Sequence, residues 1–114
     1  MRFISVDEVE QKLANGETFA VNFIAEWCPD CTRRQKPLMA DFAMLLHESD
    51  LDLVQVVVQG EVPRKFNSEA AKDLTKKFGG HGFPRTALVK DGKIIDANNV
   101  EVISEGGLIK LAAK

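Results

Sequence analysis

Hydrophobic side chains follow two different spacings along this chain, and together they predict alternating helices and strands. Residues 19–25 (FAVNFIA) and 51–58 (LDLVQVVV) are short and almost continuously apolar, which is typical of strands buried on both faces of a sheet. Before the first of them, apolar positions recur at helical spacing from the capping residue Ser5 to the stop signal Asn15-Gly16. This part of the chain is therefore predicted to form an amphipathic helix that leads into a buried strand.

Helical spacing returns after each of these strands. Apolar side chains recur over residues 29–47, and we expect one long helix there with a kink at Pro37, because proline removes a backbone hydrogen bond. A second helix is expected from a cap at Asn67 or Ser68 to Phe78, which two glycines follow. Helices in these connections allow the strands that they join to lie parallel.

The last third of the chain predicts a hairpin and a short helix. RTALVK (85–90) and KIIDA (93–97) flank Asp91-Gly92, a strong signal for a tight turn between antiparallel strands. Ser104 is expected to cap the final helix. The resulting order, β-α-β-α-β-α-β-β-α, predicts an α/β fold in which helices flank both faces of a central mixed β-sheet of four to five strands.

Composition agrees with a small soluble domain. The chain has 114 residues, of which 45% are hydrophobic, and a formal net charge of −2, so we expect a single domain over residues 1–114 and a monomer. Its charge indicates neither nucleic acid nor an anionic membrane surface as a partner. The N-terminus lacks the apolar stretch of a signal peptide, and no apolar run is long enough to span a membrane. We therefore expect a cytoplasmic protein.

The strongest candidates for reactive residues are two cysteines, the only two in the chain. Cys28 and Cys31 follow the first apolar strand, and in a reducing compartment such a pair indicates redox chemistry rather than a structural cross-link. At the N-cap of the following helix, Cys28 would be stabilised as a thiolate, the nucleophilic form. Cys31, one turn further on, would resolve the mixed disulfide. Pro29 suits the first helical position, where a missing N–H costs nothing.

Asp30 lies between the two cysteines and affects the first of them. It suits the first turn of a helix, but its charge opposes a thiolate nearby, so we expect Cys28 to be less acidified than with a neutral residue at position 30.

Two alternatives to the redox interpretation remain. The cysteines could be buried side chains without a redox role, or they could be zinc ligands. Zinc normally takes four ligands, and the chain offers no second cysteine pair, only the isolated His47 and His81.

Two segments resemble the thioredoxin family. AEWCPDC (25–31) is similar to that family's active-site signature, with Pro-Asp in place of the commoner Gly-Pro, and KFGGHGFPRTALVKDGK (77–93) is similar to the stretch that holds its cis-proline. The resemblance implies a thioredoxin fold and a cis bond before Pro84 that faces the cysteines. It also implies that Trp27 forms a wall beside the nucleophile and that the backbone of Phe83 pairs with an extended substrate. For the ring of Phe83, a place in the core is an equal alternative.

The sequence departs from the family at two of its candidate site residues. Asn22 lies where many thioredoxins keep a buried aspartate, and an amide cannot act as a general base near neutral pH. We therefore expect resolution by Cys31 to use water or a substrate group and to be slower. Arg85 replaces a small polar residue after the cis-proline. It would bring positive charge beside the substrate groove and favour acidic substrates, although we expect its side chain to be exposed and solvated.

The resemblance implies a dithiol-disulfide oxidoreductase that acts mainly as a reductase of protein or small-molecule disulfides. Electrons would come from an NADPH-linked thioredoxin reductase, and no bound cofactor is implied. The Trp-Cys-Pro-Asp-Cys string is similar to that of a small cytosolic group that reduces small or selected disulfides. Two other functions stay open: a redox-sensing module that binds one partner, and a disulfide oxidase or isomerase, which would suit an exported protein better.

Overall fold

The computed structural model of this protein describes residues 2–29, 31, 33, 36–48, 51–62, 65–79 and 83–100. Within these residues, five strands form one sheet in the order β1-β3-β2-β4-β5. They are β1 (Arg2–Phe3), β2 (Phe19–Ala25), β3 (Asp52–Gln59), β4 (Arg85–Lys90) and β5 (Lys93–Val100). The strands β1, β3 and β2 run parallel, whereas β4 is antiparallel to both β2 and β5. The predicted mixed sheet is confirmed.

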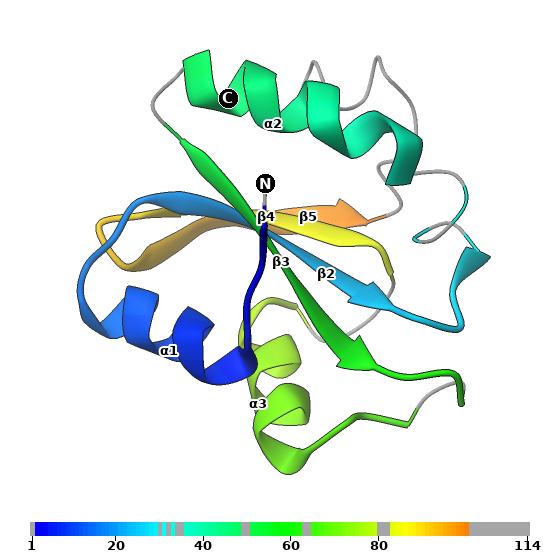
Figure 1. Cartoon of the computed structure of the whole chain (residues 1–114). Helices are drawn as coiled ribbons and strands as arrows, with labels where there is room; N and C mark the ends of the chain where they lie inside the picture. Colours follow the sequence, from blue (N-terminus) through cyan, green and yellow to red (C-terminus); the bar gives the residue numbers. More distant parts are fainter. Residues whose placement is uncertain are drawn as a thin grey trace.

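Helices cover both faces of this sheet, as predicted. They are α1 (Val6–Ala14), α2 (Met39–Glu48) and α3 (Glu69–Lys77), and a short 3-10 helix, η2 (Lys36–Leu38), precedes α2. Figure 1 shows α1 and α3 together on one face of the sheet and α2 on the other. None of the helices in the described part of the chain is long and apolar enough to cross a membrane.

The core has two layers because successive side chains of β2 point to opposite faces. Phe19, Val21 and Phe23 belong to the apolar cluster on the α1 and α3 side, whereas Ala20 packs in the cluster with α2. Phe23 also contacts the ring of Phe78 at the end of α3, with 4.8 Å between the ring centroids. Every residue of β2 is buried, which confirms the prediction of a central strand and makes it a rigid base for the residues that follow.

Local signals in the sequence determine the ends of several elements. The side-chain hydroxyls of Ser5 and Ser68 accept hydrogen bonds from the third residue of α1 and of α3 respectively, at 3.2 and 3.0 Å. Of the two caps considered for α3, Ser68 is therefore the one used. Asp91 and Gly92 both have positive φ, 53° and 76°, which is the backbone of a type I′ hairpin turn. The predicted hairpin is confirmed.

The segment after the cysteines differs from the prediction of one long helix over residues 29–47. Helical conformation begins at Pro29, Cys31 and Arg33 lie in wider π-helical turns, and η2 contains Pro37. Among the residues that the structure describes, the regular helix α2 begins at Met39, directly after the turn that contains Pro37, because the proline ring crowds the preceding turn and removes one N–H donor. The last strand is longer than predicted, since pairing with β4 continues to Val100. The helix predicted after Ser104 lies outside the described residues.

Candidate active site at the carboxyl end of β2

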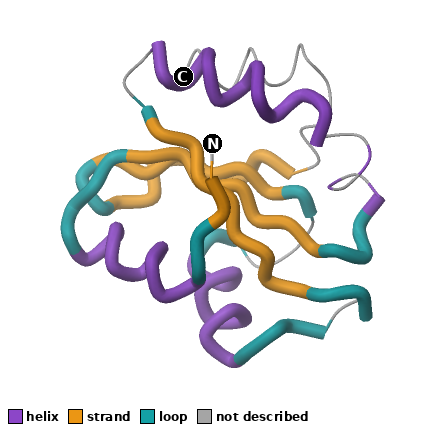
Figure 2. The backbone as a smooth tube through the Cα atoms, viewed as in Figure 1, coloured by secondary structure: helices purple, strands orange, loops and turns teal. Residues whose placement is uncertain are grey.

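The strand directions bring three segments to one edge of the sheet. Because β2 and β3 are parallel, their carboxyl ends lie together, and Figure 2 shows the loops after both strands emerging at the same end of the molecule. The first residue of antiparallel β4, Arg85, pairs with Phe23 near the end of β2. The residues that follow β2, the residues that follow β3 and the residues that precede β4 therefore meet there, and they include most of the predicted site.

The two cysteines lie together in this region, as two thiols. Cys28 and Cys31 belong to one apolar cluster, and the backbone N–H of Cys31 donates to the carbonyl oxygen of Cys28 at 3.1 Å. Each residue is only 4% exposed. Little of either cysteine is therefore open to solvent.

The segment that holds Pro84 faces the first cysteine. The bond between Phe83 and Pro84 is cis, as the resemblance implied, and the thiol of Cys28 donates to the carbonyl oxygen of Phe83 at 3.5 Å. The half-buried Phe83 side chain packs against both the main core and the cysteine cluster. The ring of Phe83 therefore belongs to the core, and its backbone carbonyl faces the thiol of Cys28; pairing of this backbone with a substrate stays a prediction.

Trp27 lies beside the cysteines and is held by the end of β3. Its indole Nε1–H donates to Gln59 Oε1 at 2.7 Å, and its backbone N–H donates to the carbonyl oxygen of Gly60 at 3.1 Å. The half-buried side chain packs against the cysteine cluster. The sequence-based prediction did not include Gln59. A polar residue directly after the apolar run 56–58 was the available signal, because such a buried side chain needs a hydrogen-bond partner.

Asn22 occupies the centre of a buried polar row that crosses three strands. Its Nδ2–H donates to Gln55 Oε1 of β3 at 3.0 Å, and its Oδ1 accepts from the hydroxyl of Thr86 in β4 at 2.8 Å. All three side chains are neutral, and the strand register places them directly opposite one another. Neither Gln55 nor Thr86 was predicted. This polar ladder satisfies the Asn22 amide in the middle of the sheet, and an amide cannot take a proton near neutral pH.

The expectation of an exposed Arg85 is wrong. Arg85 is only 5% exposed, and its guanidinium lies against Gly79, just beyond the end of α3, rather than in solvent beside the cysteines. Burial lowers the pKa of Arg85, because a cation loses hydration in the interior. Pro29 is exposed at the start of the helical segment, whereas Asp30 and His81 lie outside the described residues.

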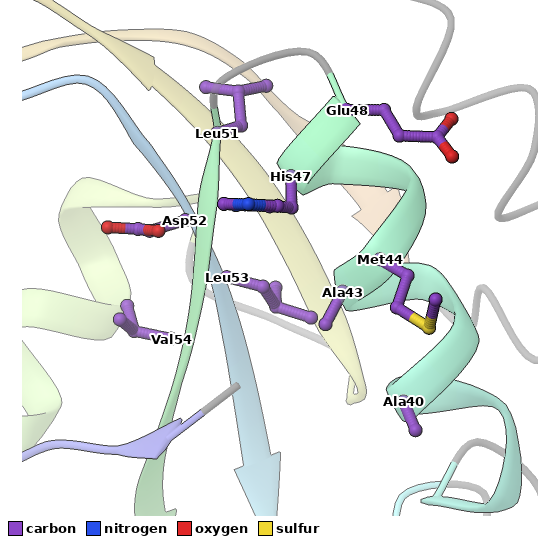
Figure 3. Close-up of a pocket in the computed structure, with 9 residues that line it drawn as sticks. All are labelled: Ala40, Ala43, Met44, His47, Glu48, Leu51, Asp52, Leu53 and Val54. Atoms are coloured by element: carbon purple, nitrogen blue, oxygen red, sulfur yellow. The ribbon is translucent and has the colours of Figure 1, made fainter.

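A separate groove lies at the other end of β3, with a volume of about 780 Å³. Figure 3 shows it between α2 and the first residues of β3, and none of the candidate site residues lines it. Its lining is mainly apolar, and the ring of His47 points from the end of α2 toward the first residues of β3. Among the described residues, no group of three or more histidine, cysteine and acidic side chains is arranged to hold a metal ion.

Comparison with known proteins agrees with this geometry. Among solved structures, thioredoxin from Plasmodium falciparum superposes with a TM-score of 0.69 at 20% identity, covering 99% of this chain and 97% of that one. Thioredoxin from Fasciola hepatica gives 0.56 at 21% identity, covering 84% and 83% of the two chains. The zinc-bound form of human ERp44 gives 0.68 at 14% identity, and the match covers 99% of this chain but only 31% of ERp44.

These structural similarities establish the fold, which is the thioredoxin fold. No curated protein sequence matches the chain. The sequence profile of the thioredoxin family, however, matches residues 2–114, nearly the whole length. This match supports thiol-disulfide oxidoreductase chemistry in general, in agreement with two adjacent thiols beside a cis-proline. The chain belongs to the thioredoxin family.

Proposed function

We propose that this protein is a dithiol-disulfide reductase that acts on protein or small-molecule disulfides, with Cys28 as the attacking thiol and Cys31 as the resolving thiol. The observation that carries the proposal is the placement of Cys28, whose sulfur lies 3.5 Å from the carbonyl oxygen of Phe83 and in one cluster with Cys31. The backbone that would pair with an extended substrate thus lies next to the sulfur that would attack it.

The reaction has two exchange steps. After its thiol proton has passed to water, the sulfur of Cys28 attacks one sulfur of the substrate disulfide. A mixed disulfide forms, and the other substrate sulfur leaves as a thiolate and is protonated. Cys31 then loses its proton and attacks the sulfur of Cys28, which releases the second substrate thiol. Two electrons and two protons pass to the substrate, and the protein is left with a Cys28–Cys31 disulfide.

The oxidised protein needs an electron donor for the next cycle. We propose an NADPH-linked thioredoxin reductase for this role and a monomer in the cytoplasm as the working form, with no bound cofactor of its own. A cysteine pair three residues apart supports thiol exchange as the means of electron delivery. Trp27 supports the proposal in a different way, because its indole is fixed by Gln59 and forms a rigid side of the approach to the thiols.

Turnover with a reducible protein tests the proposal. Wild type, Cys28→Ser and Cys31→Ser are each mixed with insulin, NADPH and a thioredoxin reductase, and NADPH oxidation is followed by absorbance. We expect sustained turnover by the wild type only. Dithiothreitol replaces the NADPH system in a parallel assay, so that an unsuitable reductase is recognised as such. An inactive wild type in both assays would contradict the reductase proposal.

The alternatives are separated by two further measurements. Trapping with Cys31→Ser in cell extract should capture many clients if the protein is an enzyme, whereas one stoichiometric client would favour a redox-sensing module. The equilibrium with glutathione should give a reduction potential nearer that of a reductant, about −270 mV, than that of a strong oxidant, about −120 mV. A potential near the second value would favour an oxidase.

A further inference from the structure

Arg85 occupies a central position for a charged residue. It is the first residue of β4, it follows Pro84 directly, and it pairs with Phe23 on one side and Val100 on the other. With 5% of its surface exposed, it is the only charged residue among the buried residues that the structure describes. Burying a guanidinium is costly unless the protein gives it favourable surroundings, so the neighbours of Arg85 indicate what it does.

The guanidinium lies against Gly79, which follows the carboxyl end of α3. A Cβ atom built on Gly79 would lie 2.9 Å from Cζ of Arg85 and nearer still to Nη1. Gly79 also has a φ of +111°, which side chains rarely tolerate. Glycine is therefore required at position 79 for two reasons: its backbone conformation, and the space that the guanidinium fills.

The end of a helix is a favourable place for this cation. The carboxyl end of a helix carries partial negative charge. The N–H groups of Phe78 and Gly79 turn back onto Thr75 and Lys76 in the last turn, and the Phe78 ring anchors this end of α3 on β2. The planar guanidinium thus lies against a helix end that is fixed to the central strand.

Arg85 is also only two residues from the backbone that faces the nucleophile. A continuous series of contacts runs from Gly79 through the Arg85 side chain to the start of β4, and from there through Pro84 to the Phe83 carbonyl and the Cys28 thiol. A shift of about 1 Å in a group that positions a substrate can cost up to about 100-fold in rate. A displacement of Arg85 would therefore move the backbone of Phe83, with which a substrate backbone would pair.

We propose that Arg85 is a positioning residue, whose guanidinium, seated against Gly79 at the end of α3, holds the Phe83 carbonyl in place for docking of a polypeptide substrate. The proposal rests on the proposed reductase function and deepens it. Polypeptide disulfides depend on backbone pairing with Phe83, whereas a small disulfide needs only access to Cys28. Arg85 therefore controls the preference for polypeptide over small substrates.

The test compares two substrates in each variant. Arg85→Met keeps an unbranched apolar stem but removes the guanidinium, and Arg85→Thr introduces a small residue that suits a strand. The matched control is Lys90→Met, at the exposed opposite end of β4. For each protein, kcat and KM are measured with oxidised insulin and with cystine, and thermal unfolding is recorded.

We expect the ratio of kcat/KM for insulin to that for cystine to fall about tenfold in both Arg85 variants, mainly through a higher KM for insulin. In Lys90→Met the ratio should stay within about twofold of wild type, since surface substitutions rarely have large effects. Arg85→Lys should restore part of the ratio, because lysine keeps the charge but lacks the planar fork. Gly79→Ala should lower the ratio with Arg85 intact, since the added Cβ displaces the guanidinium.

Equal losses with insulin and cystine in the Arg85 variants would overturn the inference, because they would indicate a general structural role. An unchanged ratio would overturn it as well. A wild type that reduces neither substrate would instead contradict the proposed reductase function, so the two failures are distinguishable. If Arg85→Met does not fold, Arg85→Lys and Gly79→Ala decide the matter by the same ratio.

Discussion

Replacing Asn22 by aspartate would place an ionisable group in the centre of the sheet, and the stability of that variant should depend strongly on pH. The Asn22 side chain is fully buried and bonded to Gln55 and Thr86. A carboxyl group there would lose its hydration, which raises its pKa above the ordinary value of about 3.9. The Thr86 hydroxyl can donate to a carboxylate and therefore favours the charged form of the new side chain. Its other neighbour in the polar ladder is also neutral, so the loss of hydration has the larger effect on the pKa of the carboxyl group.

The sign of the pH dependence follows from proton binding. Between about pH 3.9 and the raised folded-state pKa, the folded Asn22→Asp variant holds a proton that the unfolded chain has lost. The stability of the variant relative to wild type is therefore greatest below about pH 4 and falls as pH rises, by about 1.4 kcal/mol per pH unit until the folded-state pKa is passed. Since a small domain has about 5–15 kcal/mol of stability, a loss over two pH units is easily measured.

Urea unfolding of wild type and Asn22→Asp between pH 4 and pH 8 measures the difference in unfolding free energy at each pH. The control is Asn15→Asp, at the exposed C-cap of α1, where the new carboxylate is ionised above about pH 5 in both states and the difference should stay flat. A difference that is equally flat for Asn22→Asp would refute the assignment of this position to a dry, neutral ladder.

Three further predictions follow from single contacts. Gln59→Met removes the acceptor of the Trp27 indole N–H and should lower the unfolding free energy by about 1–3 kcal/mol. The fluorescence emission of Trp27, the only tryptophan in the chain, should change as well, and unchanged emission would contradict the hydrogen bond. Ser68→Ala removes the α3 cap and should lower the unfolding free energy by about 1 kcal/mol, as chemical denaturation can check. Asn22→Asp should also alter the pH profile of turnover, because a carboxylate can accept the proton of the resolving thiol. An identical profile would count against that role.

Features that depend on neighbouring residues were predictable from the sequence. The Asp91-Gly92 turn needs only two residues that tolerate positive φ, and both have it. The cap of α3 needs only a hydroxyl before the first helical turn. The cysteine pair is equally local, since three residues of separation after a buried strand bring two thiols together. The mixture of parallel and antiparallel strands followed from helices that connect parallel strands and from the hairpin near the end of the chain.

Features that depend on contacts distant in the sequence were not predictable. The burial of Arg85 requires the missing side chain of Gly79 and the end of α3, which no local pattern reveals. The partners of Asn22 depend on the register between three strands, so a single polar residue in an apolar run could not identify them. The irregular segment around Pro37 was expected as a kink, but helical spacing alone could not show where the regular α-helix begins.

The central claim is that Cys28 attacks the substrate disulfide and Cys31 releases it. Intact-protein mass spectrometry after mixing excess oxidised insulin with each single variant tests this directly. A covalent adduct should persist with Cys31→Ser, and peptide mapping should locate it at Cys28, whereas Cys28→Ser should form none. A stable adduct through Cys31 in Cys28→Ser, or the lack of an adduct in Cys31→Ser, would contradict the account.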